Sequence, residues 1–156
     1  MKTLKYMMLT AIIVASAQTM SITAKNITVP KMYMFGFAAS FNDSIVHFTD
    51  IQTLDNVWID QKTEFLAGRE NYSYQLRDFL ADKQQMPHRT CVVIYNQNRQ
   101  KLEKEYLKMK RIYTTGQKKA KKKKNNSNIQ SHNELRMLPA SEFNFCVVDM
   151  SGPTNE

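Results

Sequence analysis

The sequence predicts an α+β fold: a two-layer domain with a mixed sheet of four or five strands and helices on one face. Short apolar runs that are rich in β-branched and aromatic residues indicate the strands. Two longer stretches repeat their apolar residues at helical spacing. An initial hairpin is followed by alternating helices and strands, which is typical of crossover connections. Residues 31–150 have the length of one such domain.

The first two strands are expected to form the hairpin. Residues 31–41 are densely apolar, and their aromatic residues alternate, which places them on one face of a strand. These aromatic residues are Tyr33, Phe35 and Phe37. Turn-forming residues follow, and 44–49 is apolar again, so an antiparallel pair is the simplest arrangement.

The residues around this hairpin are more polar. Residues 18–30 end in Pro30 and are expected to be a flexible lead-in to the domain. Residues 57–59 predict a third, short strand, because turn residues bracket an apolar triplet there.

The first helix is expected to begin near Asn71 or Ser73, either of which can cap free N–H groups. It ends before Pro87, because proline disfavours the helical conformation of the residue before it. Its apolar stripe consists of Tyr72, Leu76, Phe79 and Leu80. Residues 89–96 form the clearest strand. Their apolar run is continuous rather than alternating, which predicts a central strand that is covered on both faces.

The second helix is expected to follow a cap at Asn96 or Asn98 and to run through Tyr113. Its apolar stripe is narrow and consists of Leu102, Tyr106, Met109 and Tyr113. Residues 142–150 predict the last strand, and 151–156 a loose tail.

Residues 1–17 have the pattern of a secretory signal peptide. Lys2 and Lys5 precede an apolar run at 6–14, and small residues end it before a cleavage site after Ala17, or alternatively after Ala24. The run is shorter than the ~20 residues that a membrane-spanning helix needs. We therefore expect a periplasmic or secreted protein, without a lipid-carrying cysteine at the cleavage site and without a transmembrane segment in the mature chain.

The net charge of +8 is concentrated in two places, the leader and a low-complexity stretch at 117–128 that is expected to be disordered. The lysines of this stretch are Lys118, Lys119, Lys121, Lys122, Lys123 and Lys124. Nucleic-acid-binding proteins spread basic residues over a folded face, so no nucleic-acid partner is expected. The lysine stretch indicates an anionic envelope component or another exported protein as a possible partner, or a solvated loop with no partner.

Two cysteines, Cys91 and Cys146, lie in similar Cys-Val-Val contexts. In an oxidising compartment they can form a disulfide, provided that their strands are neighbours. The alternative is two buried thiols that act as small apolar residues.

Motifs for catalysis are weak. A hydrolase site near the 42–50 hairpin would combine a serine, Ser40 or Ser44, with a histidine base and a carboxylate. The candidate residues are His47, Asp43 and Asp50. On a strand these residues do not all share one face, and no nucleophile-elbow pattern surrounds either serine.

No cofactor and no metal is expected, because the histidines lie far apart and the sequence has no Cys-x-x-Cys or glycine-rich phosphate loop. The hypothesis that follows is an exported, non-enzymatic domain that serves as a binding or structural accessory of the cell envelope. The alternatives are a small secreted hydrolase and a binder of anionic polymer or lipid. The latter would use the lysine stretch together with Lys104, Lys108 and Arg111.

Overall fold

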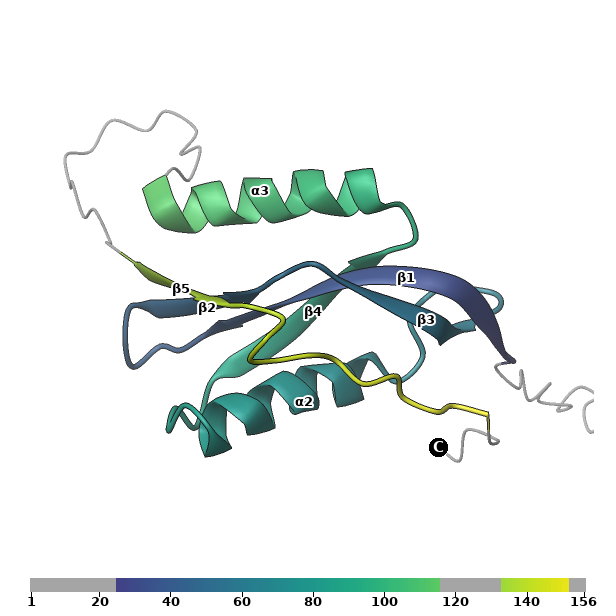
Figure 1. The fold of residues 1–156 in the computed structure, drawn as a ribbon, viewed down its shortest axis with the longest axis horizontal. Helices are drawn as coiled ribbons and strands as arrows, with labels where there is room; N and C mark the ends of the chain where they lie inside the picture. The colour runs from purple at the N-terminus through teal and green to yellow at the C-terminus, as the bar shows by residue number, and fades with distance from the viewer. Residues whose placement is uncertain (1–24, 116–132, 152–156) are drawn as a thin grey trace, which may run out of the picture.

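The computed structural model describes residues 25–115 and 133–151 of the chain. They form a mixed five-stranded sheet with two helices, which confirms the α+β class (Figure 1). The elements are β1 (Asn26–Ala39), β2 (Ile45–Thr49), β3 (Gln52–Asp60), α2 (Arg69–Asp82), β4 (Thr90–Asn96), α3 (Arg99–Thr115) and β5 (Glu134–Leu138). No helix in the described ranges is long and apolar enough to cross a membrane.

β1 is the central strand of the sheet, and all three strands that pair with it are antiparallel to it. β4 shares partner residues on β1 with both β3 and β2, so β4 lies along one edge of β1 and the other two lie along the opposite edge. β5 pairs in parallel with β2. Every strand except β1 therefore runs in the same direction.

A bulge separates β2 from β3. Met34 pairs with Gln52 and Phe37 pairs with Phe48, so three residues of the β2–β3 chain face only two residues of β1. The backbone N–H of Gly36 donates a hydrogen bond of 2.8 Å to the hydroxyl of Thr49 at this bulge. The extra residue bends the strand, so that one continuous stretch of chain covers most of one edge of β1.

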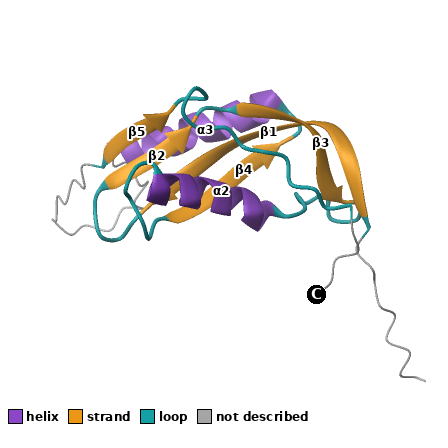
Figure 2. Ribbon diagram, turned by 60° about the horizontal axis from the view of Figure 1, so that its bottom comes forward, coloured by secondary structure: helices purple, strands orange, loops and turns teal. Residues whose placement is uncertain are grey.

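The two helices lie on opposite faces of the sheet, which differs from the expectation of one face (Figure 2). The even-numbered residues of β1 around Met34 pack under α2, and the odd-numbered aromatic residues around Phe35 pack under α3. The reason is the direction of winding. α2 connects β3 to β4 across β1, and α3 returns across β1 and β2 to β5. Right-handed crossovers that run in opposite directions use opposite faces of a sheet.

β1 begins at Asn26, so residues 26–30 belong to a strand and not to a flexible lead-in. The pairing of Asn26 with Asp60 holds this end in the sheet, and β3 is longer than the predicted 57–59. The polar residues at 26–30 thus belong to the exposed end of a strand. Pro30 lacks an N–H group, and Asn56, which lies opposite in the register, has a left-handed φ of 53°.

β4 lies at an edge of the sheet, so the prediction of a central strand is wrong. Among the described residues it pairs with β1 alone. α2 contacts β4 on one face of the sheet and α3 contacts it on the other. These contacts explain the continuous apolar run that indicated a covered strand. The position in the sheet depends on the direction of α2, and no local pattern encodes that direction.

The last strand is β5 at 134–138, and the predicted strand at 142–150 is wrong. Residues 142–150 form no strand, although Phe143 and Phe145 are buried against the α2 side of the sheet. Side chains replace a neighbouring strand: the amide of Gln52 bonds the carbonyl of Phe143 and the N–H of Phe145, both at 2.8 Å. Gln75 of α2 bonds the N–H and the carbonyl of Cys146 in the same way.

The helix boundaries follow their caps. Gly68, in a left-handed conformation, precedes α2, so this helix begins earlier than the predicted Asn71 or Ser73. The predicted cap of α3 at Asn98 is confirmed, because its side-chain oxygen accepts a hydrogen bond of 3.0 Å from the N–H of Lys101.

Candidate functional site

The hairpin candidates do not assemble into a catalytic site. The carboxylate of Asp43 forms an ion pair of 2.7 Å with Arg89, whose other terminal nitrogen donates to the carbonyl of Ile45. A hydrogen bond from the N–H of Ile45, together with Arg89, lowers the pKa of Asp43. Asp50 accepts a hydrogen bond from the N–H of Ala140 and so fixes the start of the C-terminal segment. Both carboxylates therefore hold the backbone in place.

His47 is buried, with 2% of its surface exposed, and its Nδ1 has no hydrogen-bond partner among the described residues. Burial, followed by the charges of Arg89 and Arg136, lowers its pKa to about 4, so it is neutral at neutral pH. No hydrogen bond in the described ranges joins it to Ser40, Ser44 or a carboxylate. The base, nucleophile and orienting acid of a hydrolase are not brought together here.

The cysteines are both free, so the structure does not contain the proposed disulfide between Cys91 and Cys146. Cys91 is half-buried on β4, and burial raises its pKa to about 11. Cys146 is exposed on the segment that Gln75 holds. A disulfide was predicted only if the two strands were neighbours, and residues 142–150 do not join the sheet.

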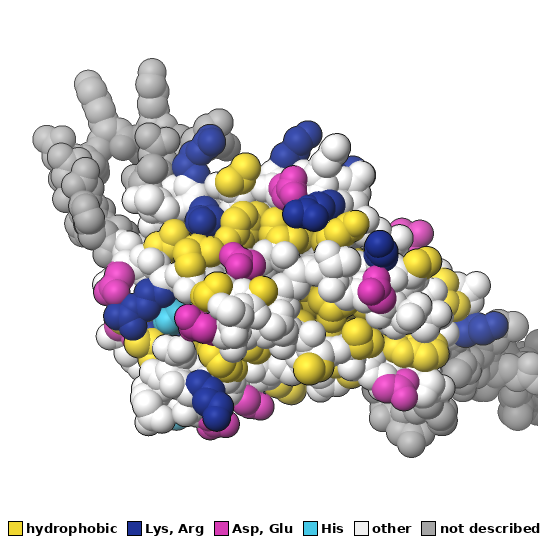
Figure 3. Space-filling model, viewed as in Figure 1, with side chains coloured by type: hydrophobic (Ala, Val, Ile, Leu, Met, Phe, Trp, Pro, Cys, Tyr) yellow, Lys and Arg dark blue, Asp and Glu magenta, His cyan; other side chains and the backbone are white. Residues whose placement is uncertain are grey.

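The lysine stretch, Lys118 to Lys124, lies outside the described residues, as do the leader and the tail beyond Ser151. The basic residues of α3 that were grouped with it, Lys104, Lys108 and Arg111, are described. Lys101, Lys104, Lys108 and Arg111 are exposed at spacings of three, four and three along the helix, so they share its solvent face. Figure 3 shows Lys and Arg side chains protruding over α3.

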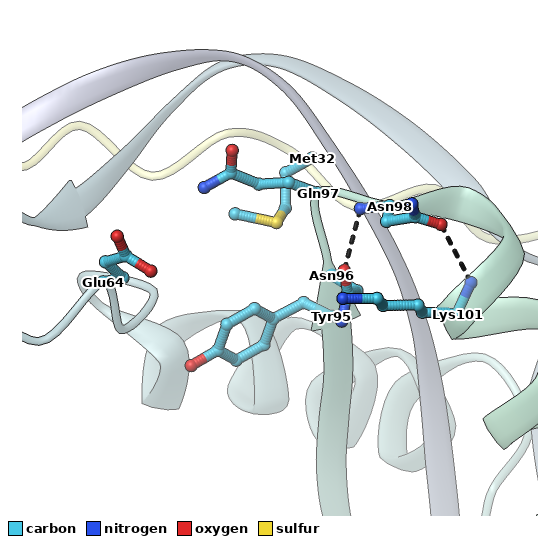
Figure 4. Close-up of a pocket in the computed structure, with 7 residues that line it drawn as sticks. All are labelled: Met32, Glu64, Tyr95, Asn96, Gln97, Asn98 and Lys101. Carbon is cyan, nitrogen blue, oxygen red and sulfur yellow. Dashed lines mark hydrogen bonds between the residues drawn. The ribbon is translucent and has the colours of Figure 1, made fainter.

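A hollow of about 450 Å³ opens between the β3–α2 loop and the end of β4 (Figure 4). Its lining residues are Met32, Glu64, Tyr95, Asn96, Gln97, Asn98 and Lys101. The loop after β3 leads to α2 on one face, and the loop after β4 leads to α3 on the other face. The volume is within the range of small-molecule sites.

The β3–α2 loop presents Glu64 from a tightly bonded turn. The carboxylate of Asp60 accepts hydrogen bonds from the backbone N–H groups of Lys62 and Thr63 and from the hydroxyl of Thr63. These bonds lower the pKa of Asp60, the first of them being that from Thr63. Glu64 has a φ of 59°, a left-handed conformation that is uncommon for glutamate and that clusters at ligand sites.

The β4–α3 connection presents amides. The N–H of Asn98 donates a hydrogen bond of 2.8 Å to the side-chain oxygen of Asn96, and Asn98 in turn caps α3 (Figure 4). No hydrogen bond within the described ranges uses the amide nitrogen of Asn96 or the side chain of Gln97. These groups are available to a ligand and can serve it as donors or acceptors.

Opposite charges flank the hollow. Glu64 and Lys101 extend into it from opposite sides, and Tyr95 lies between them (Figure 4). The Tyr95 hydroxyl accepts a hydrogen bond of 3.1 Å from the N–H of Leu66, which ties the β3–α2 loop to β4. This arrangement is able to bind a ligand with a positive group near Glu64 and a negative group near Lys101. No histidine, cysteine or serine lines the hollow.

Sequence reasoning missed this site. The signal for it is the polar run Asn96–Asn98 between a strand and a helix, which was interpreted only as a cap. Glu64 carries no motif, and its place in the hollow depends on the contact of the β3–α2 loop with Tyr95 of β4. No group of three or more potential metal ligands occurs among the described residues.

Comparisons with known proteins give no relatives for this chain. No family model, no curated protein and no solved structure matches it. The geometry of the described residues is therefore the basis for any functional proposal.

Proposed function

We propose that this protein is an exported, non-enzymatic binding domain of the cell envelope, and that its ligand occupies the hollow between the β3–α2 loop and the end of β4. The observation that carries the proposal is the pair of opposite charges, Glu64 and Lys101, which face each other across the hollow. Among the described residues, the amide nitrogen of Asn96 and the side chain of Gln97 in its lining have no hydrogen-bond partner. A closed, apolar pocket or a single sign of charge would have indicated a different ligand class.

The chemistry of the lining favours a small zwitterion, such as a free amino acid or a short peptide with free ends. An ammonium group would pair with Glu64 and a carboxylate with Lys101, through charge-assisted hydrogen bonds. The amides of Asn96 and Gln97 complement a peptide group, and the ring of Tyr95 offers apolar area beside them. In this proposal the ligand is bound and released without a chemical change, with Glu64 and Lys101 acting as charge partners.

A secreted hydrolase receives no support from the hairpin. Asp43 is engaged by Arg89, His47 is buried and neutral, and Asp50 holds the backbone of Ala140. A working acid–base pair needs groups within hydrogen-bond reach of a shared substrate.

The test is calorimetric titration with alanyl-alanine and with the same dipeptide blocked at both ends. We expect heat from the free dipeptide and none from the blocked one. The changes Glu64→Gln and Lys101→Gln each remove one charge and should weaken binding at least about tenfold, the low end for a hydrogen bond to a charged group. Lys104→Gln, one turn further along α3, is the matched control. Equal binding of the free and blocked dipeptides would contradict the proposal.

The export part of the proposal rests on the basic, apolar and small-residue pattern of residues 1–17. Intact-mass measurement of the protein from cells tests it. We expect a chain that begins at Gln18, or at Lys25 for the alternative cleavage. A cytosolic chain that still carries Met1 would contradict export.

A second candidate function is supported by α3. The four exposed basic residues on its solvent face point to an anionic polymer, held by attraction that salt screens. Retention on a heparin column should fall when Lys104 and Lys108 are both changed to Gln. It should not change with Lys62→Gln, a lysine in the β3–α2 loop. Equal retention of the two variants would contradict a role for α3.

A further inference from the structure

The open edge of β4 is the most unusual surface of the described chain. Its sequence, TCVVIYN, has the apolar content of a central strand, yet none of its seven residues is buried. Thr90 and Val92 are exposed, with 42% of the surface of Val92 open to solvent. A long, apolar and uncharged edge is a template for pairing with another strand, and proteins usually protect such edges.

The other outer strands have that protection. β5 carries Glu134 and Arg136, which form an ion pair of 2.8 Å on the strand. β3 carries Asp55 and Asp60, and its Ile59 forms a β-bridge with Leu66. β4 has no charged residue, no proline and no bulge in its pairing with β1. The lack of protection is therefore specific to one side of the sheet.

We propose that β4 pairs with the β4 strand of a second copy of this chain, in antiparallel orientation about a two-fold axis. A strand without charges can pair with itself without placing like charges opposite each other. A two-fold pair also closes, whereas pairing of β4 with the charged β5 or β3 edge would continue from copy to copy into an open fibre. Self-pairing is the arrangement that uses the unprotected edge and no protected one.

A second feature adjoins this edge. An apolar hollow of about 350 Å³ lies beside the start of β4, lined among others by Phe37, Phe41, Val92 and Tyr113. Phe41, at the β1–β2 turn, is fully exposed. In a two-fold pair centred on Val93, Ile94 of the second copy lies opposite Val92 and extends this apolar lining. The pair then buries apolar groups that a single copy leaves in water.

Sedimentation velocity on the purified protein, in the form that cells accumulate, measures the association. We expect a dimer, and we expect Val92→Lys to raise its dissociation constant at least about tenfold, because two lysines then lie close to the axis. The control is Leu107→Lys, which places the same charge on an exposed apolar residue of α3, with 61% of its surface open. This control should stay dimeric.

Hydrogen exchange gives a second readout that does not depend on the variant. Alternate N–H groups of β4 point away from β1, and in the dimer they should exchange slowly, whereas dilution or Val92→Lys should speed them up. A wild-type protein that stays monomeric up to about 1 mM with fast exchange at these groups would overturn the proposal. So would a dimer that Val92→Lys leaves intact, or edge N–H groups that become protected only when a different protein is added.

Discussion

At the scale of single residues, two buried polar side chains of the described ranges stand out. His47 and Arg89 are both buried, and each has one nitrogen without a hydrogen-bond partner in the described ranges. Arg89 is nevertheless well placed, because it joins Asp43 to the carbonyl of Ile45 and so fixes the turn between β1 and β2. Buried polar groups without a hydrogen-bond partner cost stability.

The titration of His47 should make the fold sensitive to acid. Its pKa is about 4 in the folded protein and near 6.5 when unfolded, so the unfolded state binds the extra proton between these values. Stability is then full above pH 6.5 and falls as the pH drops toward 4, by up to about 3 kcal/mol. The groups that act on it are Arg89, Arg136, Asp43 and Glu134.

Urea unfolding at pH 7 and at pH 4.5 measures this difference. The change His47→Leu should reduce it, and His88→Asn, at an exposed histidine with a left-handed backbone, should not. An unaltered pH dependence in His47→Leu would contradict the assignment to His47.

The two thiols should differ in reactivity. Titration of the denatured, unreduced protein should find both cysteines free. In the native protein at pH 8, exposed Cys146 should react with a thiol reagent at least about tenfold faster than Cys91, whose pKa is raised to about 11 by burial. A denatured sample with no free thiol would show that a disulfide forms after all.

At the scale of elements, the C-terminal segment depends on side chains for its hydrogen bonds. Gln52 and Gln75 each bond two backbone groups of the segment, but Gln52 is buried and Gln75 bonds the exposed residue Cys146. Removing a buried partner leaves donors and acceptors without water, and removing an exposed one does not. The two glutamines thus perform the same task at different depths.

The change Gln52→Ala should therefore lower the free energy of unfolding by about 1–3 kcal/mol. Gln75→Ala should cost less than half of that, because water can reach the backbone of Cys146. Chemical denaturation of both variants provides the comparison. Equal losses of unfolding free energy in the two variants would mean that the burial of a glutamine does not control its contribution to stability.

The approach of α2 to the sheet depends on Gly36. A Cβ atom there would lie 2.6 Å from Cδ2 of Leu76, with Phe145 and Thr49 also close. Gly36→Ala should destabilise the protein by about 1–3 kcal/mol through overpacking. A thermal melt compares it with Ala38→Gly, on the same face of β1, which instead removes a buried methyl group. A Gly36→Ala variant as stable as the wild type would contradict this tight contact.

Periodicity predicted most elements at this scale. The alternating aromatic residues of β1, the stripes of both helices and the Asn98 cap all follow from spacing and local chemistry. Residues 142–146 alternate exposed and buried positions like a strand, but glutamine side chains provide hydrogen bonds to their backbone. A pattern of apolar residues reports burial, and it does not report which group accepts the backbone hydrogen bonds.

At the scale of the whole molecule, the direction of winding determines what spacing cannot. Because α2 and α3 cross the sheet in opposite directions, they cover opposite faces, and the loops after β3 and β4 diverge around a hollow. The same geometry leaves β4 at an edge. The faces that the helices cover, the edge position of β4 and the candidate site all depend on this reversal in the direction of the chain between α2 and α3. No residue pattern in the sequence indicates the reversal.

The central claim is that the hollow between the β3–α2 loop and the end of β4 binds a ligand that carries both a positive and a negative group. The most direct measurement is an NMR titration of the amide signals with alanyl-alanine. We predict saturable shifts that are largest at Glu64, at Asn96–Asn98 and at Lys101, and that disappear when both ends of the dipeptide are blocked. Shifts that spread evenly over the chain, or that centre on a different surface, would contradict the account.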